Sequence, residues 1–162
     1  MNQLFPDRRL ILCRPSCRRP NERSFAESTP EKPIFWGVAV GLIQAFSPLG
    51  LWWLEPTLVW SLALVGIASV YVGFAVADGR TRVIVVEVGV TSAFVILAAI
   101  AVVASPWLSV VALVAHGIKD LWQHRTRFVA NTRWWPPFCL VVDFVAGAVI
   151  AVLLLSGVRL HG

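Results

Sequence analysis

Long apolar runs separated by short polar segments are the main pattern along this chain. Each run contains about 18–22 residues, enough for a helix to cross a hydrocarbon core roughly 30 Å thick. In chain order, the runs cover residues 34–54, 57–77, 83–104, 106–123 and 136–156. The pattern predicts an all-α membrane protein, a bundle of five transmembrane helices formed by a domain of residues 34–158.

The fourth run, residues 106–123, is the least apolar, because His116, Lys119 and Asp120 interrupt it. If this run were only a re-entrant hairpin, the basic segment that follows it would face outward. That placement opposes the excess of Lys and Arg that cytoplasmic loops carry. Charge therefore favours five spans over four.

Basic residues and tryptophans indicate the orientation of the predicted bundle. With five spans, Arg159 is the one basic residue on the C-terminal side of the membrane. The other Lys and Arg residues all lie on the side of the N-terminus. The tryptophans fall near the two membrane boundaries, as in aromatic belts. The inner group is Trp36, Trp122, Trp134 and Trp135, and the outer group is Trp52, Trp53, Trp60 and Trp107. We expect a cytoplasmic N-terminus and a C-terminus outside.

Composition narrows the class of protein and its partners. Hydrophobic residues make up 57% of the 162 residues and charged residues 14%, with a mean hydropathy of +0.74. This composition excludes an ordinary soluble protein. The net charge is +5 and the pI is near 9.9, but the basic residues lie beside the spans. Anionic inner-leaflet headgroups are therefore the expected partner rather than nucleic acid. Residues 1–33 are predicted to form a disordered basic cytoplasmic tail.

Ionisable side chains inside the apolar runs are the main functional signal. Glu87 lies roughly 6 Å into the third run, and Asp143 roughly 10 Å into the fifth. His116 lies at a similar depth in the fourth run. A charged group at the centre of a bilayer costs about 2.5–3.5 kcal/mol on insertion scales. We therefore expect these three side chains to face the interior of the bundle and one another.

The fourth run carries further polar residues on the same helical face. His116, Asp120 and His124 are spaced by four residues, with Glu87 and Asp143 expected opposite them. This set of nitrogen and oxygen ligands suits Zn²⁺, Mn²⁺ or Fe²⁺. The same residues could act without a metal as a general acid–base pair. Structural alternatives are a Glu87–Arg82 pair, a solvated His124 and a His116–Asp143 pair that only fixes helix packing.

The segment from His116 to His124, followed by Trp134-Trp135-Pro136-Pro137-Phe138-Cys139 and Asp143, carries a recognisable combination of spacings. It resembles an uncharacterised family of small bacterial membrane proteins with the pattern His-Gly-x-x-Asp-x-x-His-His, then Trp-x-Pro-x-Phe-Cys-x-x-x-Asp. The resemblance covers roughly residues 112–148. It implies a multi-pass protein of the bacterial inner membrane and a shared site at His116, Asp120, His124 and Asp143. This chain departs from the pattern at Gln123, which stands where the family has a histidine.

Three classes of function fit these observations. The first is an intramembrane enzyme, metal-dependent or acid–base, that acts on an apolar or lipid substrate through a pocket open toward lipid. The second is an accessory subunit whose polar residues only lock the helix packing. The third is a small proton or ion transporter that uses Glu87 and Asp143, and a channel of this kind would require a homo-oligomer because five helices enclose little volume. No nucleophile motif, phosphate loop or dinucleotide fingerprint identifies a reaction.

Overall fold

The computed structural model describes residues 31–130, 132 and 134–158, and this part of the chain is helical, with no strand. In chain order, the helices are α1 (Glu31–Gly50), α2 (Pro56–Asp78), α3 (Thr81–Ala104), α4 (Trp107–Thr126) and α5 (Trp135–Leu155). The first helix begins three residues earlier than predicted. It also ends four residues earlier, because residues 51–54 form a turn. The predicted disordered tail, except for its last residues in α1, lies outside the described residues.

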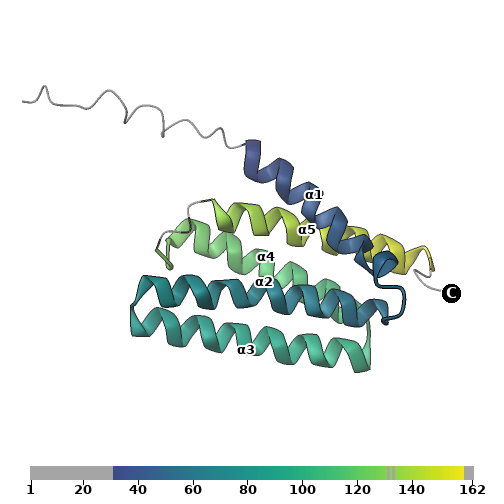
Figure 1. The fold of residues 1–162 in the computed structure, drawn as a ribbon, viewed down its shortest axis with the longest axis horizontal. Coiled ribbons are helices and arrows are strands. Elements are labelled where there is room, and N and C mark those ends of the chain that lie inside the picture. Colours follow the sequence, from purple (N-terminus) through teal and green to yellow (C-terminus); the bar gives the residue numbers. More distant parts are fainter. Residues whose placement is uncertain (1–30, 131, 133, 159–162) are drawn as a thin grey trace, which may run out of the picture.

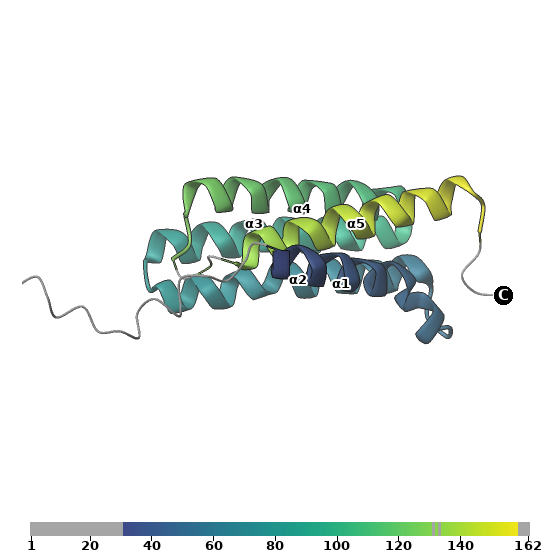
Figure 2. The ribbon, with the colours of Figure 1, turned by 90° about the horizontal axis from the view of Figure 1, so that it is seen from above.

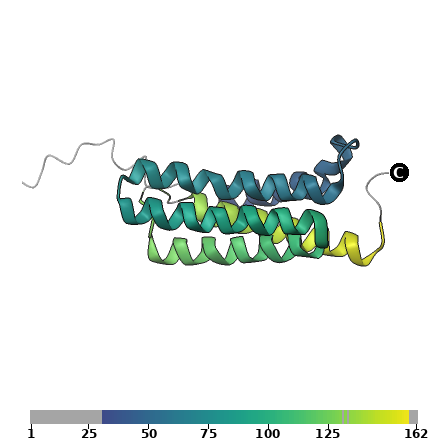
Figure 3. The same cartoon turned by 90° about the horizontal axis from the view of Figure 1, so that it is seen from below.

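Consecutive helices run in opposite directions along one long axis, so the bundle alternates up and down (Figure 1). The helix α5 packs extensively against both α1 and α4, and α2 packs against α3. The view in Figure 2 places α4 on the other side of α5 from α1, and Figure 3 shows α2, α3 and α4 running side by side. Contacts between α1 and α2 are sparse. As a result, α1 is joined to the bundle mainly through α5, and α5 is joined to α2 and α3 through α4.

Four of the described helices are long and apolar enough to cross a membrane, namely α1 from Pro33 onward, α2, α3 and α5. The helix α4 has a similar length of 20 residues but carries more charge. Its ionisable residues His116 and Asp120 are buried, whereas Val111, Ile118 and Trp122 on its outer face are exposed. Thus α4 presents an apolar side outward and a polar side to the interior of the bundle.

Two glycines set the close approach of α1 to α5. A Cβ atom at Gly37 would lie 2.8 Å from Val141 Cβ, and one at Gly41 would lie 2.9 Å from the carbonyl oxygen of Val142. Such close backbone contact is how helices associate in lipid, where burial of apolar surface provides little driving force. The spacing Gly-x-x-x-Gly puts both residues on one face of α1, so any larger residue there would separate the two helices.

The placement of Trp60 differs from the prediction. Its side chain is only 3% exposed and belongs to the hydrophobic core with Leu64, Ala68 and Ala112. The indole nitrogen donates a hydrogen bond of 3.1 Å to the carbonyl oxygen of Ala45 on α1. The prediction of an interfacial belt position for Trp60 was therefore wrong. In an apolar helix, the core-facing side and the lipid-facing side have the same composition, so position along the helix alone could not distinguish them.

The loop after α4 is fixed to the turn between α2 and α3. The guanidinium of Arg80 donates hydrogen bonds to Asp78 Oδ2 at 2.8 Å and to the carbonyl oxygen of Phe128 at 2.7 Å. The amide of Ala130 donates to the same carboxylate oxygen at 2.7 Å. Hydrogen bonding to Asp78 raises the pKa of Arg80 above its ordinary value, so this residue stays charged. Both connections therefore lie at the same end of the bundle.

Candidate metal centre

A histidine and two aspartates meet in the interior between α4 and α5. The Nδ1 atom of His116 lies 2.8 Å from Asp143 Oδ2 and 3.6 Å from Asp120 Oδ2. One potential ligand atom from each residue lies within 4.8 Å of the other two. All three side chains are fully buried. The structure therefore brings together three of the residues that the sequence singled out, on two neighbouring helices.

Helical spacing and one glycine produce this convergence. His116 and Asp120 are four residues apart on α4, so their side chains are neighbours on one face. Between them, Gly117 allows α5 to come close. A Cβ atom at this position would lie 2.9 Å from the ring of Phe144 and 3.4 Å from Asp143 Cβ. The small residue at 117 thus leaves room for the Phe144 ring beside Asp143.

Aromatic rings enclose the imidazole on its other sides. The ring of Phe94 on α3 meets His116 edge-on with centroids 5.0 Å apart, and Tyr71 on α2 does so at 5.9 Å. Four helices therefore contribute to the walls of this centre. Because surrounding side chains exclude water from such an environment, any charge on the three ligands must be offset by neighbouring groups.

Several polar atoms of the centre have no hydrogen-bond partner among the described residues. They are His116 Nε2, both carboxylate oxygens of Asp120, Asp143 Oδ1 and the hydroxyl of Tyr71, which lies beside Asp120. Buried oxygens of this kind are normally satisfied, because leaving one without a partner costs about 1–3 kcal/mol. The centre consequently has oxygen and nitrogen atoms whose hydrogen-bonding capacity is not used by the described residues.

Next to the centre lies a second polar group that includes Glu87. Its carboxylate lies 3.0 Å from Lys119 Nζ and accepts a short hydrogen bond from the Gln123 side-chain amide. The Lys119 ammonium also lies over the Tyr71 ring, 3.2 Å from its centroid, in a cation–π contact. Glu87 is therefore paired with Lys119 on α4 rather than with Arg82, which is exposed. Its carboxylate is not one of the three converging groups.

The other expected ligand, His124, is not brought to the centre. Its side chain is exposed at the end of α4. Each step of four residues rotates a side chain by about 40° around the helix, so His124 lies about 80° from His116. The solvated state, which the sequence left open for His124, is the one observed. Cys139 is buried close by on α5 but is not part of the group of three.

Two residues of this region were not singled out from the sequence as site residues. Lys119 looked like a basic residue of the cytoplasmic boundary, and Tyr71 looked like part of an apolar run. The available signal for Lys119 was its position inside the fourth apolar run, next to Asp120. Tyr71, the chain's single tyrosine, lies within an otherwise apolar helix, which was the signal for a polar role.

Comparisons with protein-family models, with curated proteins and with solved structures found no match. The geometry of the buried residues therefore carries the functional interpretation.

Proposed function

We propose that this integral membrane protein binds a divalent transition metal ion, Zn²⁺, Mn²⁺ or Fe²⁺, through His116, Asp120 and Asp143. The observation that carries the proposal is the convergence of an imidazole and two carboxylates in a fully buried site. An imidazole with carboxylates is a donor set that these ions accept. Metal–ligand bonds of about 2.0–2.2 Å keep the ligand atoms of one ion within about 4.4 Å of one another. The two distances from His116 Nδ1 fall inside this limit, and the three ligand atoms together lie within 4.8 Å of one another, so binding of one ion requires the two aspartates to move slightly closer.

Charge balance supports a cation at this place. The positive charge of Lys119 is matched by Glu87, 3.0 Å away. The two aspartates would then leave two negative charges inside the bundle if His116 were neutral. Isolated buried charges are costly, so either the carboxyl groups take up protons or a divalent ion coordinated by both offsets their charge. The ion also supplies partners for the aspartate oxygens that have none among the described residues.

The function we infer for such an ion is catalysis on an apolar or lipid substrate. Structural zinc sites have four protein ligands, whereas catalytic sites have three and keep one position open. Three protein ligands converge here among the described residues. An ion held by these three residues would act as a Lewis acid on an oxygen of the substrate.

Elemental analysis of the detergent-purified full-length protein tests the metal site. The protein should be isolated with a tag that does not bind metal and without chelators. We expect near-stoichiometric Zn, Mn or Fe in the unchanged protein and at least about tenfold less in Asp120→Asn and His116→Gln. Ser109→Ala is a matched control on α4, because Ser109 is buried, lies two turns of helix from His116 and hydrogen-bonds through its side chain to Ser61. A folded unchanged protein without metal would contradict the proposal.

A metal-free acid–base site is the second candidate, and one contact favours it. The 2.8 Å hydrogen bond between His116 Nδ1 and Asp143 Oδ2 resembles a histidine oriented by a carboxylate. The other ring nitrogen, Nε2, has no partner among the described residues and could exchange a proton with a substrate. This alternative is favoured if the folded protein contains no metal and Asp143→Asn abolishes an activity that the unchanged protein has. If Asp143→Asn only lowers the free energy of unfolding, an accessory subunit is favoured.

We also propose that α4 is a fifth span, with the N-terminus cytoplasmic and the C-terminus outside a bacterial inner membrane. The hydrogen bonds from Arg80 to Phe128 and from Ala130 to Asp78 support this, since they place the connection after α4 beside the α2–α3 connection, at the end of the bundle opposite to the start of α4. Twenty helical residues extend about 30 Å, the thickness of a hydrocarbon core. The exposed Arg82, Arg125 and Arg127 lie at this end of the bundle, as expected for the cytoplasmic side.

Accessibility of single cysteines tests the topology. In a background with Cys13 and Cys17 changed to serine, Ala130→Cys should react with a membrane-impermeant maleimide from the cytoplasmic side. Val158→Cys, which is also at an exposed position, should react from the opposite side. Cys139 is buried, so it provides little background labelling. The reverse result, with Ala130→Cys outside and Val158→Cys inside, would contradict the proposed topology.

A further inference from the structure

Tyr71 lies against the proposed metal centre from the side of α2. Its side chain is fully buried. The ring meets the imidazole of His116 edge-on with centroids 5.9 Å apart, and the Lys119 ammonium lies 3.2 Å from the centroid of the Tyr71 ring. The hydroxyl lies beside the carboxylate of Asp120. One side chain therefore adjoins two of the three proposed ligands as well as the neighbouring polar group.

The Tyr71 hydroxyl and the Asp120 carboxylate each lack what the other offers. The hydroxyl is a donor without a hydrogen-bond partner among the described residues, and both oxygens of Asp120 are acceptors without one. Buried polar atoms are normally hydrogen-bonded, because leaving one without a partner is costly. The ammonium of the adjacent Lys119 is directed instead to Glu87, 3.0 Å away, and to the Tyr71 ring. The hydroxyl is therefore the donor placed to serve Asp120.

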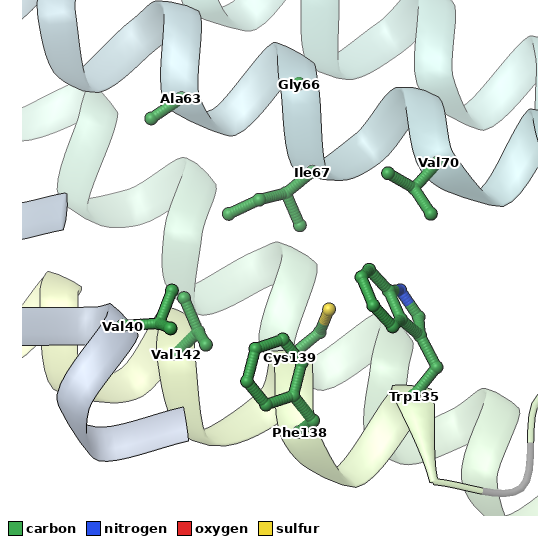
Figure 4. Close-up of a pocket in the computed structure, with 9 residues that line it drawn as sticks. All are labelled: Val40, Ala63, Gly66, Ile67, Val70, Trp135, Phe138, Cys139 and Val142. Carbon is green, nitrogen blue, oxygen red and sulfur yellow. The ribbon is translucent and has the colours of Figure 1, made fainter. Parts of the chain in front are cut away.

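Another side of α2 offers the hydroxyl no polar partner. An apolar groove with a volume of about 390 Å³ lies there, between α2 and the pair formed by α1 and α5 (Figure 4). Val70 lines it from α2, Val40 from α1 and Val142 from α5, and its surface is almost entirely hydrocarbon. Successive residues of a helix point about 100° apart, and Tyr71 is not among the lining residues. Its ring contacts two residues of α4 instead, so the hydroxyl lies in the polar interior.

We propose that Tyr71 is a positioning residue of the metal centre. Its hydroxyl donates a hydrogen bond to one oxygen of Asp120, while the other oxygen of Asp120 binds the ion. This inference rests on the metal site proposed above. Carboxylates that bind a metal are in turn hydrogen-bonded, and these outer partners orient them. Binding of one ion draws Asp120 toward the other ligands, and a bond that fixes its orientation reduces the freedom lost in that step.

The affinity for zinc in Tyr71→Phe tests the role of the hydroxyl. This change removes one oxygen atom and keeps the ring, with its contacts to His116 and Lys119. The full-length protein is freed of metal in detergent, and Zn²⁺ is returned in competition with a chelator of known affinity. Zinc is used because such sites bind it more tightly than Mn²⁺ or Fe²⁺. We expect the dissociation constant to rise by about 10–100-fold, the usual effect of losing an outer partner of a metal ligand.

Ser61→Ala is the matched control for the loss of a buried hydroxyl from α2. Ser61 lies about 15 Å along the helix from Tyr71, and its hydroxyl pairs with Ser109. This variant should bind zinc with the dissociation constant of the unchanged protein. Metal-free Tyr71→Phe should unfold at the same concentration of denaturing detergent as the metal-free unchanged protein, because the hydroxyl has no partner among the described residues. A change in unfolding without a change in zinc affinity would assign Tyr71 to packing alone and overturn the proposal.

The Raman spectrum supplies a direct readout, because the chain contains a single tyrosine. The relative intensity of the two bands of the tyrosine Fermi doublet distinguishes a phenol that donates a strong hydrogen bond from one without a partner. We expect the donor signature in the zinc-loaded protein. Bands of a phenolate would make Tyr71 a direct ligand, and bands of a phenol without a partner would leave Asp120 unsupported. Either result overturns the proposal.

Failure of this proposal can be distinguished from failure of the metal site. An unchanged protein that binds no zinc refutes the site and the role of Tyr71 together. Bound zinc with the same dissociation constant in Tyr71→Phe and in the unchanged protein refutes the role of Tyr71 and leaves the site at His116, Asp120 and Asp143 standing.

Discussion

Replacing Glu87 with leucine should destabilise the protein by about 3 kcal/mol, because it leaves the Lys119 ammonium without its carboxylate inside the bundle. The two groups are 3.0 Å apart, and the Lys119 side chain is only 13% exposed. The remaining contact over the Tyr71 ring would compensate for a small part of the loss. The measurement is the free energy of unfolding in mixed detergent micelles, obtained by titration with a denaturing detergent.

A double variant separates the pairing from simple packing effects. Changing Glu87 to Leu and Lys119 to Met removes both charges and keeps similar side-chain volume. We expect this protein to lie within about 1 kcal/mol of the unchanged one, since a buried ion pair is often replaced by apolar residues at little cost. If Glu87→Leu alone cost less than about 1 kcal/mol, the Lys119 ammonium would have to be solvated, which contradicts a buried pair.

The helices could be predicted from the sequence because a membrane imposes a length and a composition on each span. Runs of about twenty apolar residues correspond to four helices with boundaries a few residues away from those expected. The error at the end of α1 has a local cause. The helix ends at Gly50, and the amide of Leu54 then bonds to the carbonyl oxygen of Leu51 in a turn. An apolar turn has the same hydropathy as an apolar helix.

The faces of the helices could not be predicted in the same way. In a soluble protein, polar residues mark the outer face, but in lipid both faces are apolar. Trp60, Leu64 and Ala68 face the core, whereas Leu62 between them is exposed, and nothing in their hydrophobicity distinguishes the two groups. The glycines of α1 and the groove beside α2 were also not anticipated, since both depend on how closely particular helices pack.

Polar residues inside the spans were the informative exception. An imidazole or carboxylate is costly in hydrocarbon, so its face of the helix must turn inward. From this rule we expected His116, Asp120 and Asp143 to face one another, and the structure places them in contact. It was not enough for Glu87 or His124. The partner of Glu87 is Lys119, which had been assigned to the boundary, and His124 is rotated out of the bundle near the end of α4.

The second large effect is expected at the contact between α1 and α5. Changing Gly41 to leucine should cost about 3 kcal/mol, because a Cβ there already meets the Val142 carbonyl oxygen and Val145 Cβ at 2.9 Å, and a larger side chain forces the helices apart. Gly89→Leu is the matched control, since no described atom lies within 4 Å of a Cβ at that position on α3. The same detergent titration measures both variants. Equal stabilities would mean that α1 is not held against α5 by this contact. A loss confined to Gly41→Leu would establish that the contact fixes α1, and with it one wall of the groove.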